Sequence, residues 1–374
     1  MIFAIFLTVA ILFAATFVSC GGGNMEIKLG GVGPLTGEAA TFGTSTKQGI
    51  EMAVDEWNAK GGILGKKIKL VFADDKGDVA EGATVYTKLI QQDKVIAIVG
   101  TVMSKVTLAG APIAQQAKIP MISHISTNER ITLVGDYIFR ACFIDSFQGA
   151  VGAKFAVEDL KAKSAAAFFD IGNDYTKGLS ENFKATFEKL GGKIVAYEGH
   201  ATGTTDFKAQ LTKIVQAKPD IIYVSDYYND VALIAKQARE LGFKGPLVGG
   251  DGWDSPELVK IGGTAIENCF FTNHYSPDDT RSVVQEFVKN FRARYSSTPD
   301  AMATLAYDAT YIMLNAIKVA GKTDGAAIKD ALAKTDLGVV SGQVRFDANR
   351  NPIKSAVIIE IKGGKQVYRT TVTQ

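Results

Sequence analysis

The chain repeats one pattern that strongly limits its fold: a short apolar run, then an amphipathic window with helical period. Apolar runs that alternate with helices are typical of parallel sheets covered by helices on both faces. Two series of such runs occur, and 374 residues are too many for one compact core, so we predict two domains. The predicted strands of the first series are Ile27–Val32, Ile68–Phe72, Val95–Val99, Ile119–Ser123 and Tyr137–Phe143. Those of the second are Ala165–Phe169, Ile194–Tyr197, Ile221–Ser225, Leu247–Gly249 and Cys269–Thr272.

The windows between these runs carry helical spacing and helix-ending signals. In Thr46–Lys60, apolar residues recur at i, i+3, i+4 and i+7 from Ile50 onward, and Gly61-Gly62 follows as a C-terminal cap. After the second series, two further helices, Ser282–Tyr295 and Asp300–Ala320, add no strand of their own. We therefore expect the region from 281 to 320 to pack back on the first domain.

The C-terminal tail has the pattern of strands and a hairpin, with Gly363-Gly364 as the turn. Its strands are predicted at Val344–Phe346, Ala356–Ile361 and Gln366–Thr371. The whole pattern predicts an α/β protein of two doubly wound parallel-sheet lobes, between which the chain crosses near 141–146, 270–276 and 341–346. We assign residues 27–143 plus 272–342 to an N-terminal lobe, and residues 144–271 plus 343–374 to a C-terminal lobe.

The first nineteen residues carry no charge and lead to Cys20 and three glycines (MIFAIFLTVAILFAATFVSCGGG). An apolar stretch of this length could be a transmembrane helix, but the small residues that close it favour a cleavable secretion signal. Ser19-Cys20 resembles the lipobox of bacterial lipoproteins, in which the cysteine becomes the lipidated first residue. We expect a signal peptide at 1–19, a lipid on Cys20 and a tether at 20–26. An uncleaved anchor and ordinary secretion are the alternatives, and all three place the folded part outside the cytoplasmic membrane.

Composition excludes several classes of protein. The net charge is +2 with both signs interspersed, whereas a nucleic-acid surface would show clustered Lys and Arg. Cys142 and Cys269 could pair in an exported protein, although two apolar-strand cysteines are more often buried free thiols. With three His and no CxxC, we expect no metal site and no cofactor.

Polar residues gather where the predicted strands end. In open parallel sheets, ligands bind beyond the carboxyl ends of the strands. In the first domain these positions hold Gly100-Thr101, Ser104, Ser123, Ser126 and Thr127. In the second they hold Asp170, Asn173, Asp174, Tyr175, Asp226, Tyr227, Tyr228, Asp251, Gly252 and Trp253. A ligand between the domains could touch both groups.

The chemistry of the two groups differs. Ser104 and Thr127 lie at predicted helix starts, where free N–H groups and hydroxyls suit an anion such as a carboxylate. Asp251 suits a cation, and Tyr175, Tyr227 and Trp253 offer apolar and cation–π surface. Taken singly, the hydroxyls could be ordinary N-caps, Asp251-Gly252 a turn, and the aromatic residues interface packing. Their joint placement predicts an amino-acid site.

Catalysis has little support in the sequence. His124 lies beside Ser123 and Ser126, but neighbours in sequence do not form a triad, and no GxSxG occurs. The chain also lacks GxxxxGK[ST] and a strand-borne GxGxxG, so phosphate and dinucleotide binding are not indicated. We expect a binding protein rather than an enzyme, in which His124 is incidental.

Three segments carry a family resemblance. "IKLGGVGPLTGEAATFG", "GIEMAVDEWNAKGGILGKKIKLVFADD" and "KQARELGFKG" make the chain similar to the leucine/isoleucine/valine-binding proteins, over nearly all of 27–374. These are type I periplasmic binding proteins of branched-chain amino-acid ABC transporters. The resemblance implies two lobes joined by a three-stranded hinge.

The resemblance also implies roles for particular residues. Ser104 and Thr127 match residues that bind the ligand carboxylate, and Thr127 and the carbonyl of Ile125 match groups that contact its ammonium. Asp251 stands where many members have Glu, which is longer by one methylene. Residues that match the lining of the side-chain pocket are Phe42, Tyr175 and Tyr227. We add Trp253 because it lies next to Asp251 in the sequence.

The function implied is that of a monomeric clamp, which captures a free amino acid and docks on the membrane subunits of an ABC permease. Closure is favoured because some ligand contacts exist only in the closed state. A second possibility is a sensory receptor that uses the same clamp. A third is the same fold with an amide, urea, nucleobase or aromatic acid as ligand.

Overall fold

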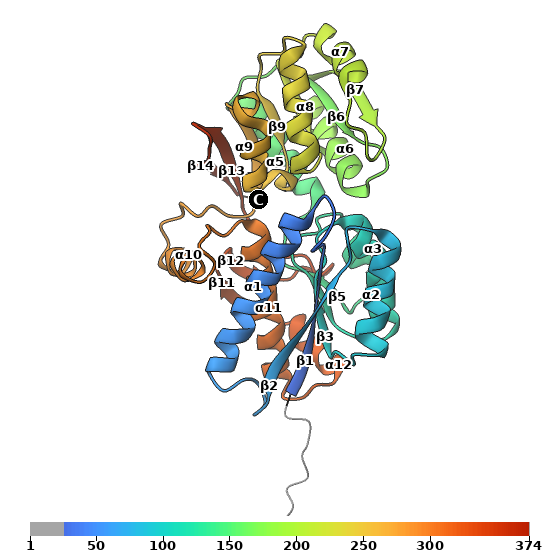
Figure 1. Cartoon of the computed structure of the whole chain (residues 1–374), viewed down its shortest axis with the longest axis vertical. Coiled ribbons are helices and arrows are strands. Elements are labelled where there is room, and N and C mark those ends of the chain that lie inside the picture. The colour runs from blue at the N-terminus through green and yellow to red at the C-terminus, as the bar shows by residue number, and fades with distance from the viewer. Residues whose placement is uncertain (1–25, 374) are drawn as a thin grey trace, which may run out of the picture.

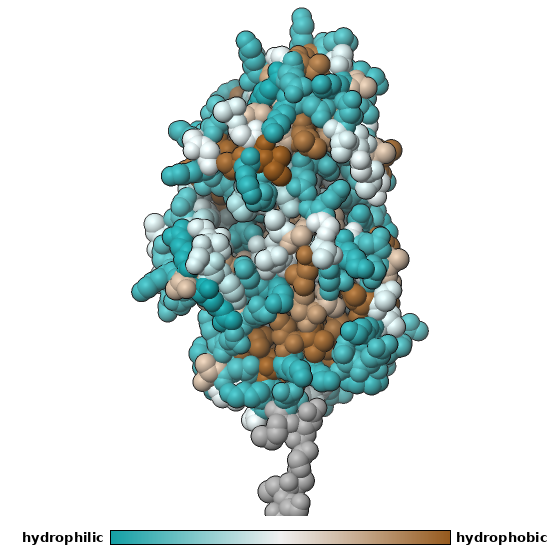
Figure 2. Space-filling model, viewed as in Figure 1, coloured by the Kyte–Doolittle hydropathy of each residue, from teal (hydrophilic) through white to brown (hydrophobic). Residues whose placement is uncertain are grey.

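The structure is a computed structural model that describes residues 26–373, and it has two lobes stacked along its long axis (Figure 1). The predicted signal peptide at 1–19, Cys20 and the predicted tether up to residue 25 lie outside the described residues. No helix within 26–373 has both the length and the apolar character needed to cross a membrane. Hydrophilic residues cover most of the face seen in Figure 2.

The N lobe contains a parallel five-stranded sheet in the order β2-β1-β3-β4-β5. Its strands are β1 (Glu26–Gly33), β2 (Lys67–Asp74), β3 (Ala97–Val99), β4 (Met121–Ser123) and β5 (Ile138–Arg140). The helices that connect them are α1 (Ala40–Ala59), α2 (Val79–Gln91), α3 (Ser104–Gln116) and α4 (Arg130–Leu133). Val99 belongs to one apolar cluster and Ile98 to another, so helices cover both faces of this sheet.

The C lobe contains a seven-stranded sheet in the order β14-β13-β10-β9-β8-β6-β7. Its parallel strands β6 to β10 are arranged in the same way as β1 to β5 of the N lobe, and β13 pairs antiparallel with both β10 and β14. Its strands are β6 (Ser164–Asp170), β7 (Lys193–His200), β8 (Ile221–Val224), β9 (Leu247–Gly249), β10 (Cys269–Asn273), β13 (Ala356–Lys362) and β14 (Lys365–Val372). Its helices are α5 (Asp145–Glu158), α6 (Asp174–Lys189), α7 (Lys208–Gln216), α8 (Tyr228–Glu240), η1 (Asp251–Trp253), α9 (Pro256–Gly262) and η2 (Gly263–Ile266). The predicted fold of two doubly wound lobes is thus confirmed.

The region after β10 returns to the N lobe. It forms α10 (Ser282–Tyr295), α11 (Ala301–Ala320), α12 (Gly325–Leu332) and a small antiparallel pair, β11 (Asp336–Val339) with β12 (Gly342–Arg345). Helix α11 packs along α1 and supplies Ile312, Met313 and Ile317 to the N-lobe core. The predicted strand Val344–Phe346 overlaps β12, whereas β11 and its pairing with β12 were not predicted.

The chain passes between the two sheets three times, in the segments 141–144, 274–281 and 346–355. The strands β10 and β12 extend to Asn273 and Arg345, slightly beyond the predicted lobe boundaries, and the lobe ranges themselves stay a prediction. Lys354 ties two crossings together, because its buried Nζ donates to the carbonyl of Ala141 at 3.1 Å and to the hydroxyl of Ser341. Both Cys142 and Cys269 are buried and free, so they form no disulfide here.

The packing of α1 against α11 depends on Gly49. A Cβ atom at Gly49 would lie 2.1 Å from the carbonyl oxygen of Ala303, so the two helix backbones touch at this point. Nearby, the hydroxyl of Tyr295 donates to the carbonyl of Gln48 at 3.0 Å. No side chain other than hydrogen fits at position 49 without moving a helix.

We predict that Gly49→Ala lowers the free energy of unfolding by about 1–3 kcal/mol, as overpacking does in other cores. At an ordinary helix position the same change would raise the free energy of unfolding by about 1 kcal/mol, so the sign of the measured change shows whether the helices touch. Urea unfolding followed by circular dichroism measures the change. The control is Thr44→Ala on the exposed face of α1, which we expect to alter stability by less than about 0.5 kcal/mol. A stabilised Gly49→Ala variant would show that the helices do not touch there.

Candidate ligand-binding site

The N-lobe half of the site is a loop that follows β4 and is fixed by its own hydroxyls. The hydroxyl of Ser126 lies 2.9 Å from the carbonyl oxygens of both Thr101 and Val102, and the N–H of Ser126 donates to Ser123 Oγ at 3.1 Å. These bonds hold the loop beside the start of α3, where the N–H of Asn128 meets Ser104 Oγ at 3.4 Å. Ser126 is therefore structural, and Ser104 and Thr127 are left to face the cleft.

A buried arginine on β5 holds the same loop from behind. The guanidinium of Arg140, which has no exposed surface, donates to the carbonyls of Ser126 at 3.1 Å, Asn128 at 2.7 Å and Glu129 at 3.3 Å. Because these carbonyls flank Thr127 on both sides, Arg140 sets the path of the backbone that presents it. Sequence reasoning missed this role, since nothing in a strand sequence shows which loop an arginine will reach.

His124 has a structural role. Its Nε2 lies 2.9 Å from the hydroxyl of Thr46 on α1, and the ring is fully buried. Burial, with a smaller contribution from the charge of His274, lowers the pKa of His124 to about 3. The imidazole is therefore neutral at ordinary pH and connects the loop to α1.

The C-lobe half of the site consists of residues at three strand ends. Asn173 caps α6 by accepting a hydrogen bond from the N–H of Tyr175 at 3.1 Å, which directs Tyr175 into the cleft. The rings of Tyr175 and Tyr227 stack with centroids 5.3 Å apart. The hydroxyl of Tyr175 then accepts from the N–H of Gly252 at 3.1 Å and donates to Asp251 Oδ1 at 2.9 Å.

Asp251 is surrounded by neutral donors. Besides Tyr175, Gln148 Nε2 donates to Oδ1 at 2.8 Å, and His274 Nε2 lies 3.0 Å from Oδ2. Burial lowers the pKa of His274 against the opposing attraction of Asp251, so the ring donates as a neutral imidazole, stacked on Phe143 at 3.7 Å. No Lys or Arg of residues 26–373 forms an ion pair with Asp251. The carboxylate is held firmly, but its charge is not neutralised.

These groups enclose one small cavity between the lobes. Six of the eight ligand-site residues predicted from sequence line it, together with three that were not predicted: Ser104, Ile125, Thr127, Tyr175, Tyr227 and Asp251, then Val102, Gly252 and Met302. Of the unpredicted ones, Met302 comes from α11, and no local pattern shows that this helix returns to the cleft. Because Ser104, Thr127 and Asp251 are all buried, a ligand reaches the cavity only when the lobes separate.

The other two predicted residues do not border the cavity. Trp253 is fully buried behind it, with its indole N–H donating to the carbonyl of Val224 at 3.0 Å. It fits there because Gly249, whose Cβ would lie 2.2 Å from the indole, has no side chain. Phe42 lies behind Tyr227, edge to face, with ring centroids 6.1 Å apart. Both residues support the aromatic wall from outside.

Asp145, at the start of α5, is a further acidic group that sequence reasoning missed. Its N–H donates to the carbonyl of Thr127 at 3.1 Å, and it has no exposed surface. Neither carboxyl oxygen has a hydrogen-bond partner among residues 26–373. Burial, reinforced by the charge of Glu129 and opposed by the charge of Arg140, raises the pKa of Asp145 well above its ordinary value. A cation beside Asp145 would stabilise its ionised form.

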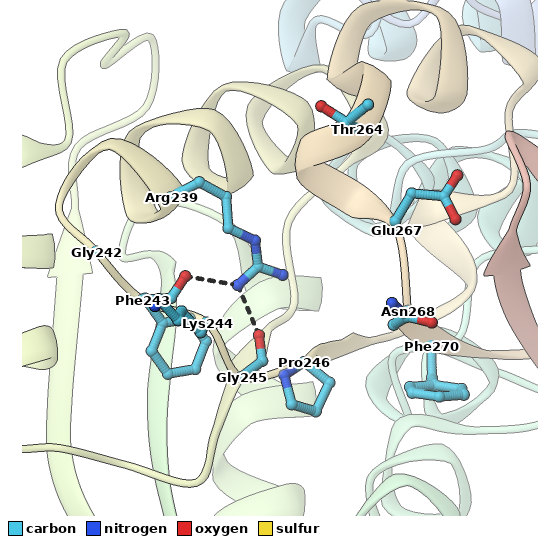
Figure 3. A pocket seen from close by; sticks show the side chains of 10 residues that line it. All are labelled: Arg239, Gly242, Phe243, Lys244, Gly245, Pro246, Thr264, Glu267, Asn268 and Phe270. Carbon is cyan, nitrogen blue, oxygen red and sulfur yellow. Dashed lines mark hydrogen bonds between the residues drawn. The ribbon is translucent and has the colours of Figure 1, made fainter.

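A hollow at the far end of the C lobe lacks comparable chemistry (Figure 3). It lies where β9 and β10 begin, whereas the cleft lies where they end. The guanidinium of its one arginine lining residue, Arg239, already donates hydrogen bonds within the protein, to the carbonyls of Phe243 at 2.9 Å and Gly245 at 2.6 Å (Figure 3). The interlobe cavity is therefore the better candidate for the principal ligand.

Comparison with known proteins agrees with this geometry. The sequence model of the periplasmic binding protein family matches residues 26–366. The chain belongs to the periplasmic binding protein family. A Leu/Ile/Val-binding protein homolog of Brucella abortus is 33% identical to it over 346 residues, which cover 91% of this chain and 92% of that relative.

Two solved structures of this periplasmic binding protein type match the fold closely. The leucine-binding protein LivK of Thermotoga maritima is 38% identical, with a TM-score of 0.89, over 93% of this chain and 99% of that one. LivJ of Streptococcus pneumoniae, solved in complex with isoleucine, is 37% identical, with a TM-score of 0.87 and the same coverage. The predicted relationship to branched-chain amino-acid-binding proteins is confirmed.

We predict that Arg140→Met lowers both stability and ligand affinity. Three buried carbonyls would lose a charged donor, which we expect to cost about 3 kcal/mol of unfolding free energy. Urea unfolding and calorimetric titration with leucine measure the two effects. Arg140→Lys is the matched variant: it keeps the charge but cannot reach three carbonyls, so its affinity should fall too. Stability loss with unchanged affinity in both variants would contradict the role of Arg140 in positioning the loop.

Proposed function

We propose that this protein is the extracytoplasmic substrate-binding component of an ABC importer, and that it captures a free amino acid with a branched-chain or other hydrophobic side chain. The observation that carries this proposal is the buried Asp251 carboxylate, which is held by three neutral donors and faces the start of α3 across the cavity. The proposal agrees with the family of the chain and with its leucine- and isoleucine-binding relatives.

Each end of an amino acid finds a complementary group in the cavity. The ligand carboxylate would lie at Ser104 and Thr127, where the first N–H groups of α3 and two hydroxyls are available. The ammonium would lie against Asp251 and the carbonyl of Ile125, both of which line the cavity. The side chain would contact an apolar wall formed by Val102, Tyr175, Tyr227 and Met302.

Asp251 also distinguishes this ligand class from the alternatives. A neutral amide, urea or aromatic acid brings no cation, and a buried carboxylate without one is costly. An α-amino acid supplies a cation for Asp251, and its carboxylate also provides the anion that Ser104, Thr127 and the start of α3 would bind. Delivery to a permease is favoured over sensing because LivJ, which this chain resembles, is the substrate-binding protein of a branched-chain amino acid transporter.

Contacts across the cleft support a clamp mechanism. The hydroxyl of Tyr228 donates to the carbonyl of Glu38 at 2.8 Å, and Arg130 lies 3.0 Å from Asp174 Oδ1. Asn128 Nδ2 also donates to the carbonyl of Asp174 at 3.0 Å. The Arg130–Asp174 pair is exposed and such pairs contribute little, so the ligand would supply much of the free energy that keeps the lobes together. The closed form would then present both lobes to the permease.

We predict that Asp251→Ala weakens amino-acid binding by about 2–5 kcal/mol, the range for removing one partner of a desolvated charge pair. Asp251→Asn keeps the shape and should lose a comparable amount. Calorimetric titration with leucine, isoleucine, valine and phenylalanine measures the loss. The exposed Asp159→Asn serves as a control for changes in net charge and should bind like the parent. Unchanged affinity in both Asp251 variants, or tight binding of a neutral amide and of no α-amino acid, would refute the proposal.

We also propose that a lipid on Cys20 anchors the protein to the membrane, since Ser19-Cys20 closes an uncharged apolar segment. Replacement of Cys20 by alanine should release the protein into the soluble fraction of cells, because it removes the sulfur atom that would carry the lipid. Fractionation with immunoblotting measures the distribution, and the ligand affinity of the released protein should be unchanged. Continued membrane association of Cys20→Ala would point to an uncleaved apolar helix.

A further inference from the structure

A second cavity lies beside the crossing segment 274–281, where both lobes meet. Its volume is about 600 Å³, which is within the range of small-molecule sites. We call it the hinge groove and define it by its principal lining residues: Asp254, Val259, Tyr275, Pro299, Asp300 and Ile359. Its lining includes residues of α9, β13 and β14 of the C lobe and of the connection between α10 and α11 of the N lobe, which Figure 1 shows as ribbons.

The hinge groove has two carboxylates on one side. Asp254, which is 3% exposed, accepts from Asn273 Nδ2 at 2.9 Å and from the N–H of Ala301 at 2.7 Å, both through Oδ2. No hydrogen bond to Asp254 Oδ1 is present among residues 26–373. Asp300 accepts from the N–H of Ala303 at 2.8 Å and from Ser45 Oγ at 2.6 Å. Because Asp254 belongs to the C lobe and Ala301 starts α11, this contact already bridges the lobes.

No cation neutralises these carboxylates within residues 26–373. Three basic side chains line the groove, and none of them forms an ion pair with Asp254 or Asp300. Lys260 lies 3.3 Å from Glu257, and Arg292 Nε donates to Thr298 Oγ1 at 3.1 Å, whereas Lys365 lies at the turn between β13 and β14. Burial and then the neighbouring charge of Asp254 raise the pKa of Asp300 to about 7. A positive charge placed here would interact favourably with both groups.

Part of the groove lining is apolar. Val259 of α9, Ile359 of β13 and the buried Tyr275 form it, with Pro299 at the N-lobe side. Apolar lining together with a pair of carboxylates is complementary to a molecule with a hydrophobic body and one cationic end.

We propose that the hinge groove is a second ligand site, which binds a small amphipathic amine. The ammonium lies against Asp254 and Asp300, and the hydrophobic body lies on Val259, Tyr275 and Ile359. This site is separate from the interlobe cavity, with which it shares no lining residue.

Binding here is coupled to closure of the clamp. The lining comes from both lobes, so an occupant that fits the groove favours the arrangement in which the lobes touch. By linkage, the amine and the amino acid then raise each other's affinity by the same factor. This part of the inference rests on the proposed function, whereas binding of the amine by itself does not.

The test is calorimetric titration of the full chain with 2-phenylethylamine, and with 2-phenylethanol as the uncharged probe of matched shape. We expect the amine to bind at least about tenfold more tightly, since only it pairs with the carboxylates. Asp254→Asn should abolish this preference, and Val259→Trp should block both probes by filling the groove. Equal binding of the two probes, or an amine affinity unchanged by Asp254→Asn and Val259→Trp, would overturn the proposal.

Two controls distinguish binding in the hinge groove from binding in the interlobe cavity. Asp251→Asn should reduce amino-acid binding but leave amine binding intact. If Asp251→Asn lost amine binding and Asp254→Asn kept it, the amine would bind in the interlobe cavity and the proposal would be wrong. Thermal unfolding of each variant verifies folding, and Val259→Trp provides a second route should Asp254→Asn not fold. With leucine present, the amine should bind several-fold more tightly; independence of the two ligands would refute the coupling.

Discussion

The cleft is organised around the buried carboxylate of Asp251, which only neutral donors surround. Asp251 receives hydrogen bonds from Gln148, Tyr175 and His274, and no lysine or arginine of the described residues pairs with it. Burying a charge in this way is unfavourable unless a partner neutralises it, and Asp145 is costly to ionise for the same reason. The closed form therefore contains a buried carboxylate that the cationic end of a ligand would neutralise. Much of the specificity follows from this need for a positive charge beside Asp251.

Much of the fold could be predicted because its signals are local. Apolar runs and helical windows give the strands and helices, and the position of polar residues at strand ends places Ser104, Thr127, Tyr175 and Asp251 around one cavity. The rest depends on contacts between distant segments. Met302 lines the cavity because α11 packs back on the N lobe after the second sheet. Trp253 lies outside the cavity because Gly249, which has no side chain, leaves space for the indole. Neither contact has a signal within a few residues of sequence.

The same limit applies to the groups that support the site. Arg140 reaches backwards to the loop around Thr127, and His274 reaches from a crossing segment to Asp251. In the sequence, one looks like a strand residue and the other like a loop residue. Both connect the site to the crossings between the lobes, together with Lys354, so the geometry of the ligand contacts and that of the hinge are set by shared residues. A substitution at the hinge can alter binding without touching the ligand.

The contact of α1 with α11 at Gly49 has a consequence for the order in which the chain can fold. The parallel strands of the C lobe lie within one continuous stretch, 164–273, but the N-lobe core is incomplete without Ile312, Met313 and Ile317. A chain that emerges from its N-terminus first, from a ribosome or a translocation channel, can therefore assemble the parallel part of the C lobe before the lobe that precedes it. Until α11 arrives, the apolar face of α1 stays uncovered, so this is the interval in which the nascent protein would depend on chaperones.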